Sequence, residues 1–265
     1  MVRRVLFVLV GLLSSLSGSL SAQILDQDST DKEFFLRKES IFRLIAHSNG
    51  FGLGITRGSS ISVFKRRILE AEFVTMKAPK EIKTVYPFAD NSKSYVYGKL
   101  NQLYILRGGI GYEKQMNRKP YWGGVEIRYL YHAGASIGFV KPVYLYIINY
   151  TQNPSDPFYL TTERFDPSQH FYENIFGRAP INYGIPETKI HPGLYGKVGL
   201  NFEFGAENDR VKALEVGASC DFYPQSISIM AFNTPRNFFA SFYLSFNFGK
   251  RYNKNSKDEN EIRSN

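Results

Sequence analysis

The alternation of apolar and polar residues along extended segments is the feature that most constrains the fold of this chain. It is clearest in residues 238–248, where phenylalanine, alanine and leucine occupy every second position and serine, tyrosine and asparagine stand at most positions between them. Residues 197–204 and 214–222 follow the same scheme. Because successive side chains of a β-strand point to opposite faces, these segments predict strands with one apolar and one polar face.

Six further segments show the alternation in shorter or weaker form, and the nine together set the number of strands expected. They are residues 41–47, 51–56, 69–73, 104–111, 125–132 and 134–145. Single-chain bacterial β-barrels have even strand numbers. Joining residues 122–145 into one long strand that bends at Gly134 gives eight strands, whereas a hidden strand within residues 81–96 gives ten.

Alternation alone also fits a soluble sandwich of two sheets, whose inner faces are apolar. Several strands here reach the ~9–11 residues that a tilted strand needs to cross a bilayer. Their apolar face is crowded with phenylalanine and tyrosine, of which the chain has 22 and 18, and their other face mixes charged residues with glycine. We therefore expect an all-β fold, an antiparallel transmembrane β-barrel of eight strands, with ten as the alternative, and a long extracellular loop.

Residues 1–22 have the pattern of a secretory signal peptide. Arg3 and Arg4 precede an apolar run that is too short to span a bilayer, and small residues follow it as far as Ala22. The predicted organisation is a signal peptide in residues 1–22, a periplasmic N-terminal segment in 23–39, the barrel in 40–249 and a disordered polar tail in 250–265. The expected location is the outer membrane of a Gram-negative bacterium.

The charge and the cysteine content exclude some classes of function. Loss of the signal peptide would leave a net charge of +7 out of +9. No nucleic-acid-binding motif accompanies this charge, so an anionic membrane surface is the expected partner rather than nucleic acid. The single cysteine, Cys220, can form neither an internal disulfide nor a cysteine metal site.

Six stretches of the chain carry a resemblance to a known family. They are HSNGFGLGITRG (47–58), YVYGKLNQLYILRGGIG (95–111), GASIGFVKPVYL (134–145), HPGLYGKVGLNFEFG (191–205), ALEVGASCDFYPQSISIMAF (213–232) and FYLSFNFGKRYN (242–253). Together they resemble the uncharacterised outer-membrane β-barrel proteins of the Bacteroidota. The resemblance implies a barrel in the outer membrane, but it implies no activity and transfers no functional residue.

The polar faces of the predicted strands place a set of charges in the lumen. They are Glu70, Glu72, Arg107, Glu126, Arg128, Lys197, Glu203, Glu215 and Asp221. One interpretation is a selective pore or a proton path, and the other is a salt-bridged plug. We favour the plug, because side chains fill the interior of an eight-stranded barrel and buried charges persist only in pairs. Arg107, Arg128 and Lys197 are the expected partners of the carboxylates.

The long loop of residues 146–192 is the best candidate for a binding function. It is rich in aromatic residues and proline, which indicates either a lid that binds a ligand or partner protein, or a structural cap over the barrel mouth. The candidate binding residues are Phe158, Tyr159, Phe165, His170, Phe171 and Tyr172. Residues 167–178 are predicted to form a short helix capped by Asp166.

Two further groups of residues give only weak signals of a metal site or a catalytic site. His170 and Glu173 would need a further ligand, His191 or Asp166, to hold a metal. His132 and Ser136 suggest the His–Ser pair of outer-membrane lipid A deacylases, but they match no catalytic motif. We expect no metal, no cofactor and no catalytic residue.

The expected function is that of a non-enzymatic structural or binding component of the envelope with a filled lumen. Its expected partners are membrane lipids and an envelope protein bound through residues 146–192. Lys65, Arg66 and Arg67 either touch lipid head groups at the periplasmic rim or simply mark the edge of the apolar band. The alternatives to this function are a lipid-modifying enzyme and a narrow channel or export-machine component.

Overall fold

The computed structural model describes residues 38–62, 64–79, 81–87, 92–117, 124–151, 158–204 and 210–252. The predicted signal peptide, nearly all of the predicted N-terminal segment and residues 253–265 lie outside the described residues. Among the described residues, no helix is long and apolar enough to cross a membrane.

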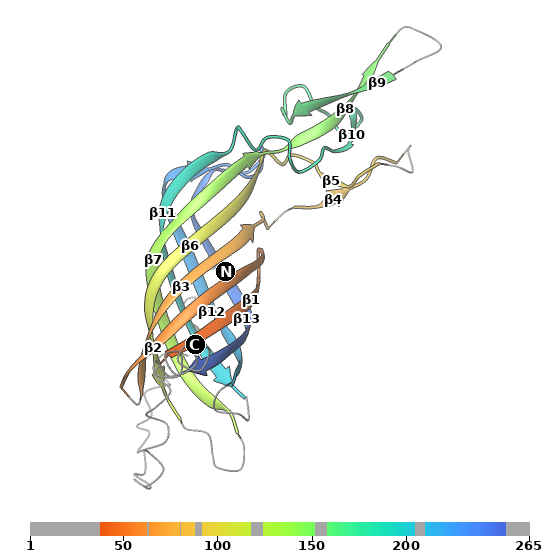
Figure 1. Ribbon diagram of the computed structural model, residues 1–265. Helices are drawn as coiled ribbons and strands as arrows, with labels where there is room; N and C mark the ends of the chain where they lie inside the picture. Colours follow the sequence, from red (N-terminus) through yellow and green to blue (C-terminus); the bar gives the residue numbers. More distant parts are fainter. Residues whose placement is uncertain are drawn as a thin grey trace, which may run out of the picture. The chain divides into compact units, whose positions relative to one another are not determined.

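Eight antiparallel strands form a closed barrel, as the alternation predicts (Figure 1). The strands are β1 (Lys38–His47), β2 (Gly50–Ser62), β3 (Lys65–Met76), β6 (Asn101–Gln115), β7 (Glu126–Pro142), β11 (Lys189–Glu203), β12 (Arg210–Ile227) and β13 (Arg236–Tyr252). The order around the ring is β1-β13-β12-β11-β7-β6-β3-β2, and β1 closes it by pairing with β13. The barrel therefore has no free strand edge.

Three predicted boundaries are wrong. β1 begins at Lys38 and β13 ends at Tyr252, so both strands extend beyond residues 40–249. β7 runs through Gly134 in unbroken register with both neighbours and ends at Pro142, where the barrel strand was expected to continue to residue 145. Gly134 is required for close approach rather than for a break, because a Cβ there would lie 2.0 Å from the Gly108 carbonyl oxygen.

The connections at the two ends of the barrel differ in length. We call one end the turn end; it carries the first residue of β1, the last residue of β13 and the connections β2–β3, β6–β7 and β11–β12. The opposite end, the loop end, carries the short β1–β2 turn at residues 48–49 and the longer connections β3–β6, β7–β11 and β12–β13, the first two of which contain two small sheets. β4 (Lys83–Thr84) pairs with β5 (Tyr95–Val96), and β8 (Tyr144–Tyr150) pairs with β9 (Phe158–Arg164) and β10 (Ile175–Arg178).

The predicted helix at residues 167–178 is wrong. Asp166 does cap the segment, since its carboxylate accepts the Ser168 N–H at 2.9 Å, but the cap opens a turn rather than a helix. From Ile175 onward the chain pairs with β8, so its backbone groups bond to another strand instead of to a helix. The hidden strand sought within residues 81–96 is likewise the short β4–β5 hairpin, outside the barrel ring.

The two faces of the barrel wall differ sharply in chemistry. Large apolar side chains cover the outer face, and Phe242 on β13 is 77% exposed. The carboxylates of the eight strands all face inward. They are Glu39, Glu70, Glu72, Glu113, Glu126, Glu203, Glu215 and Asp221, and every one is buried. The carboxylates therefore lie in the interior while large apolar side chains cover most of the outer face, which is the reverse of a water-soluble protein.

The seam between β1 and β13 closes the barrel and depends on Gly249. A Cβ there would lie 2.3 Å from the Ser40 carbonyl oxygen, whereas a Cβ on Gly108 would meet no atom within 4 Å. We predict that Gly249→Ala lowers the free energy of unfolding by about 1–3 kcal/mol, the usual cost of overpacking. Gly108→Ala is the matched control and should change it little. Urea unfolding in detergent micelles checks this, and equal midpoints for the two variants would contradict it.

Candidate functional site

The centre of the lumen is occupied by an ion-pair cluster built around Arg43 of β1. One guanidinium nitrogen, Nη2, lies 2.7 Å from Glu215 Oε1 on β12, and the other, Nη1, lies 3.0 Å from Glu72 Oε1 on β3. Nη1 also contacts the Glu70 carboxylate. All four side chains are buried, so their charges are compensated by one another rather than by water.

Two further cations complete this central layer. Lys197 of β11 places its Nζ 2.9 Å from Glu72 Oε1 and also contacts Glu70. Arg107 of β6 holds Asp221 in a two-point arrangement, with Nη2–Oδ2 at 2.5 Å and Nε–Oδ1 at 3.1 Å. Such paired bonds between guanidinium and carboxylate fix geometry as well as charge. The layer therefore links strands that are far apart around the ring.

A second layer of ion pairs lies toward the turn end. Arg128 of β7 donates to Glu126 at 2.5 Å and lies 3.0 Å from Glu203 Oε2. Arg251 of β13 also donates to Glu203, at 2.9 Å, and lies 3.3 Å from Glu39 Oε2. Glu203 of β11 is thus shared between a cation of β7 and a cation of β13, which lie on opposite sides of β11 in the ring. This layer closes the lumen close to where the chain enters and leaves the barrel.

Hydroxyl and amide groups use the remaining acceptors of the central carboxylates. The Tyr195 hydroxyl donates to Glu70, and the Tyr243 hydroxyl donates to Glu215 Oε1 at 2.8 Å. The Asn247 amide donates to Glu215 Oε2 at 3.0 Å. A network whose members are bonded in this way rigidifies its surroundings.

Apolar side chains fill the lumen toward the loop end. The fully buried members of this cluster include Val74, Met76, Leu103, Ile105 and Tyr223. Together with the two ionic layers, they occupy the interior along the strands. The arrangement is that of a packed core rather than of an open channel.

The sequence placed nine charges in the lumen, and the structure brings all nine there. They are Glu70, Glu72, Arg107, Glu126, Arg128, Lys197, Glu203, Glu215 and Asp221, each buried and each in an ion pair. Sequence reasoning missed Arg43, Glu39, Glu113 and Arg251. The two-residue spacing of Glu39, Ile41 and Arg43 is an available signal, but the alternation of apolar and polar residues in this segment is weak.

Arg66 corrects one prediction about the rim. Its side chain points inward and its Nη1 lies 2.8 Å from Glu39 Oε2. Lys65 and Arg67, its neighbours in the chain, are exposed on the outer face. Of these three cations, Lys65 and Arg67 therefore face outward and Arg66 faces the lumen.

His132 and Ser136 do not form a catalytic pair. Both lie on the inner face of β7 and are 6% and 1% exposed. Residues four apart on a strand are separated by about 13 Å along its axis, so the two side chains are not adjacent. The imidazole instead lies with Nδ1 3.4 Å from Glu70 Oε1. Facing the lumen in mid-strand, neither group has access to a lipid on the outer wall.

The connections at the loop end pack into one ordered unit. Its buried apolar cluster consists of Tyr95, Leu145, Ile147, Phe165 and Ile175. Backbone hydrogen bonds tie the connections together. The Val143 N–H donates to the Leu100 carbonyl at 2.9 Å, and the Ala231 N–H donates to the Gly98 carbonyl at 2.7 Å. The loop that was expected to be either lid or cap is therefore held to its neighbouring loops.

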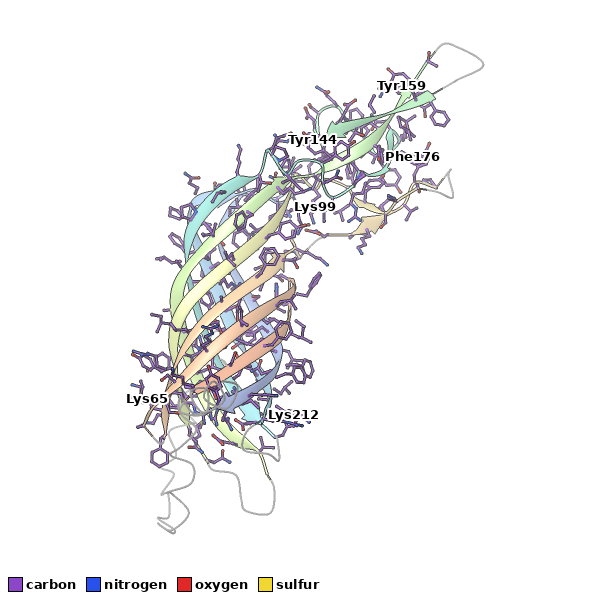
Figure 2. All side chains as sticks on the ribbon, in the orientation of Figure 1. Lys65, Lys99, Tyr144, Tyr159, Phe176 and Lys212 are labelled. Atoms are coloured by element: carbon purple, nitrogen blue, oxygen red, sulfur yellow. The ribbon has the colours of Figure 1, made fainter. Side chains whose placement is uncertain are left out.

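The six predicted loop residues divide into two groups. Phe165 and His170 are each 3% exposed and belong to the interior of the unit, so they are not available to a ligand. Phe158, Tyr159, Phe171 and Tyr172 are exposed. Figure 2 shows Tyr159 on the sheet formed by β8, β9 and β10, at the opposite end of the barrel from Lys65 and Lys212. Tyr150, 73% exposed on β8, extends the aromatic surface of the β8–β9 hairpin.

His170 has a structural role. Its Nδ1 accepts the Asp166 N–H at 3.0 Å, so the proton of the neutral ring is on Nε2, which lies 3.2 Å from Glu163 Oε2. Hydrogen bonds from the Thr161 hydroxyl, and then from His170, hold the pKa of Glu163 below its ordinary value. Both ring nitrogens are therefore engaged.

The structure does not bring together the residues of a metal site around His170. Glu173 is exposed on the loop, and His191 lies on the inner face of β11. Among the described ranges, no three potential metal ligands come together.

No protein-family model matches the chain, and no curated protein matches it. The solved structures that resemble it include Neisserial surface protein A, with 11% identity, 81% of this chain and 96% of that chain covered and a TM-score of 0.39. They also include the attachment invasion locus protein Ail of Yersinia pestis bound to the heparin analogue sucrose octasulfate (10% identity, 82% and 99% covered, TM-score 0.37). A third is the outer membrane protein OprG from Pseudomonas aeruginosa (9% identity, 83% and 97% covered, TM-score 0.34). The assignment of an eight-stranded barrel follows from the strand pairings themselves.

Removal of Arg43 tests the importance of the central ion pairs. Arg43→Met leaves Glu70 and Glu215 without one of their cations, and we predict a loss of about 3–5 kcal/mol in unfolding free energy. Adding Glu215→Gln should recover part of that loss, because it removes one uncompensated charge. Lys114→Met on the exposed outer face is the control and should cost little. Urea unfolding in micelles measures all four proteins, and an unchanged stability of Arg43→Met would contradict the prediction.

Proposed function

We propose that the protein is an outer-membrane β-barrel protein with a closed lumen, acting as a non-enzymatic structural or binding component of the cell envelope. The observation that carries the proposal is the division of chemistry between the faces of the wall. Buried, paired charges and a buried apolar cluster fill the inside, and large apolar side chains cover most of the outside.

The closed ring also meets the main requirement of a chain in hydrocarbon. Backbone N–H and C=O groups must be paired within the protein there, and a closed barrel achieves this without a helix. An apolar surface of this extent around a whole barrel is otherwise an aggregation hazard in water. The long connections at the loop end are assigned to the outside of the cell and the turn end to the periplasm, following the usual arrangement of such barrels. Export by a signal peptide in residues 1–22 and an origin in the Bacteroidota stay predictions.

The aromatic surface of the loop end supports a binding role rather than a purely structural one. Exposed rings on an ordered sheet are typical of surfaces that contact other molecules, because they bury much area at small entropic cost. The proposed occupant is an envelope protein bound through the 146–192 loop. The separation of His132 from Ser136 disfavours a lipid-modifying enzyme, and the ion pairs across the lumen disfavour a channel.

Reconstitution into planar bilayers separates the filled lumen from a channel. The purified protein should insert into the bilayer and carry no unitary current, while a porin in the same bilayer conducts. Its electrophoretic mobility in a detergent gel should shift when the sample is heated, because heating unfolds the barrel. In cells it should fractionate with the outer membrane. Robust single-channel currents would overturn the closed lumen, and a stable soluble monomer without detergent would overturn the membrane location.

A further inference from the structure

The outer wall of the barrel carries charges of only one sign. Among the described residues of the eight barrel strands, the outward-facing charged side chains are all lysine or arginine, because the carboxylates face the lumen. Most of these cations stand toward the turn end, where Figure 2 labels Lys65 and Lys212. The cations of this end are Lys38, Arg57, Lys65, Arg67, Lys114, Arg210, Lys212 and Lys250. This wall therefore favours anions at its turn end.

Four of these cations gather on adjacent strands and form what we call the basic patch: Lys38, Arg57, Arg67 and Lys250. The strand register places Ser59 between Lys38 and Arg67, and it places Ser40 between Lys250 and Arg57. Since neighbouring strands lie about 4.8 Å apart, the Cα atoms of the two cations in each pair are separated by about 10 Å, and a serine lies between them.

The basic patch has no internal counter-charge. None of its four cations forms an ion pair with a carboxylate among the described residues, whereas the inward-facing Arg43, Arg107 and Arg128 all do. The patch thus keeps its donors available to a molecule outside the barrel.

A groove in the outer wall begins at Arg57. Its volume is about 620 Å³, and its outward-facing lining combines Arg57 with Ile55, Leu69, Ala71, Gly108, Ile110 and Ala133. Alanine and glycine form its floor, and a Cβ on Gly108 would meet no atom within 4 Å, so the groove opens outward there. A second groove of about 600 Å³ lies on β11, β12 and β13, and its lining contains no charged residue.

We propose that the basic patch and the groove of β2, β3, β6 and β7 together bind one anionic glycerophospholipid. The phosphate is held by the cations and the serine hydroxyls, and an acyl chain lies along the groove. Guanidinium groups suit phosphate because they donate two parallel hydrogen bonds. The inference rests on the proposed function, since it requires the outer wall to face lipid and the turn end to face the periplasmic leaflet.

Native mass spectrometry of the full chain, released from micelles that contain either phosphatidylglycerol or phosphatidylcholine, tests the site. The parent protein should retain one phosphatidylglycerol and little phosphatidylcholine. In Arg57→Gln/Arg67→Gln the retained fraction should fall about tenfold, as expected when charge-assisted hydrogen bonds to phosphate are lost. Excess inorganic phosphate should not displace the lipid, because the groove contributes to binding. Displacement by phosphate would overturn the role of the groove.

Gly108→Leu tests the groove separately from the charges. It should fill the groove and lower retention, whereas Ala218→Leu in the second groove and Arg236→Gln at the loop end are matched controls that should not. Equal retention of the two lipids, or full retention by both Arg57→Gln/Arg67→Gln and Gly108→Leu, would overturn the proposal. Lipid A retained as well as phosphatidylglycerol would overturn the assignment to a phospholipid.

Insertion into vesicles, checked first for every variant, separates this inference from the proposed function. A parent protein that does not insert contradicts both. A variant passes this check when it inserts and keeps the heat-dependent electrophoretic mobility of the parent protein. If such variants bind lipid without the expected selectivity, the result contradicts the lipid site alone.

Discussion

Pairing of buried charges inside the barrel is the constraint on which this structure depends. Arg43 reaches from β1 to carboxylates on β3 and β12, neither of which is a neighbour of β1 in the ring. Lys197 and Arg107 likewise connect strands across the lumen. The backbone ladder joins each strand only to the next, so these side chains provide the cross-links through the interior. These cross-links form only because the carboxylates of the barrel strands face the lumen.

The outer wall follows from the same arrangement. With the acids drawn inward to meet Arg43, Arg107, Arg128 and Lys197, the exterior is left apolar over most of its area and basic toward the turn end. The charged side chains of the interior bond to one another and so stabilise the barrel. The binding that we propose therefore involves the two surfaces that remain, the outer wall and the exposed aromatic side chains of the loop end.

Period-2 alternation made most of the barrel predictable, because the face to which a strand residue points is set locally by its position. The nine lumen charges come from that local rule, whereas the count of eight strands also needed the even strand number of such barrels, which joined residues 122–145 into one strand. Arg66 obeys the same rule, because the alternation extended back from Glu70 and Glu72 places it on the inner face, but treating it as one group with Lys65 and Arg67 concealed this. Arg43 was missed because its strand is short and its partners lie far away in the sequence.

The loop end was less predictable, because its structure depends on contacts between distant segments. Asp166 and Pro167 give a valid helix-start signal, yet pairing of β10 with β8 determines the outcome. Phe165 and Tyr159 look equivalent in the sequence, but only packing against Tyr97 and its neighbours decides that the former is buried. The sequence alone carries no local signal that separates the two rings.

The central claim is that the outer wall contacts hydrocarbon while the polar faces look inward, and the native Cys220 offers the most direct test. It lies on the outward face of β12 between Gly196 and Ala240, beside the fully buried Asp221. A nitroxide label on Cys220, in protein reconstituted into vesicles, should collide readily with oxygen and rarely with a water-soluble nickel complex. A label on Ser219→Cys, in a Cys220→Ser background, should be shielded from both. Free collision of the Cys220 label with the nickel complex would contradict the account.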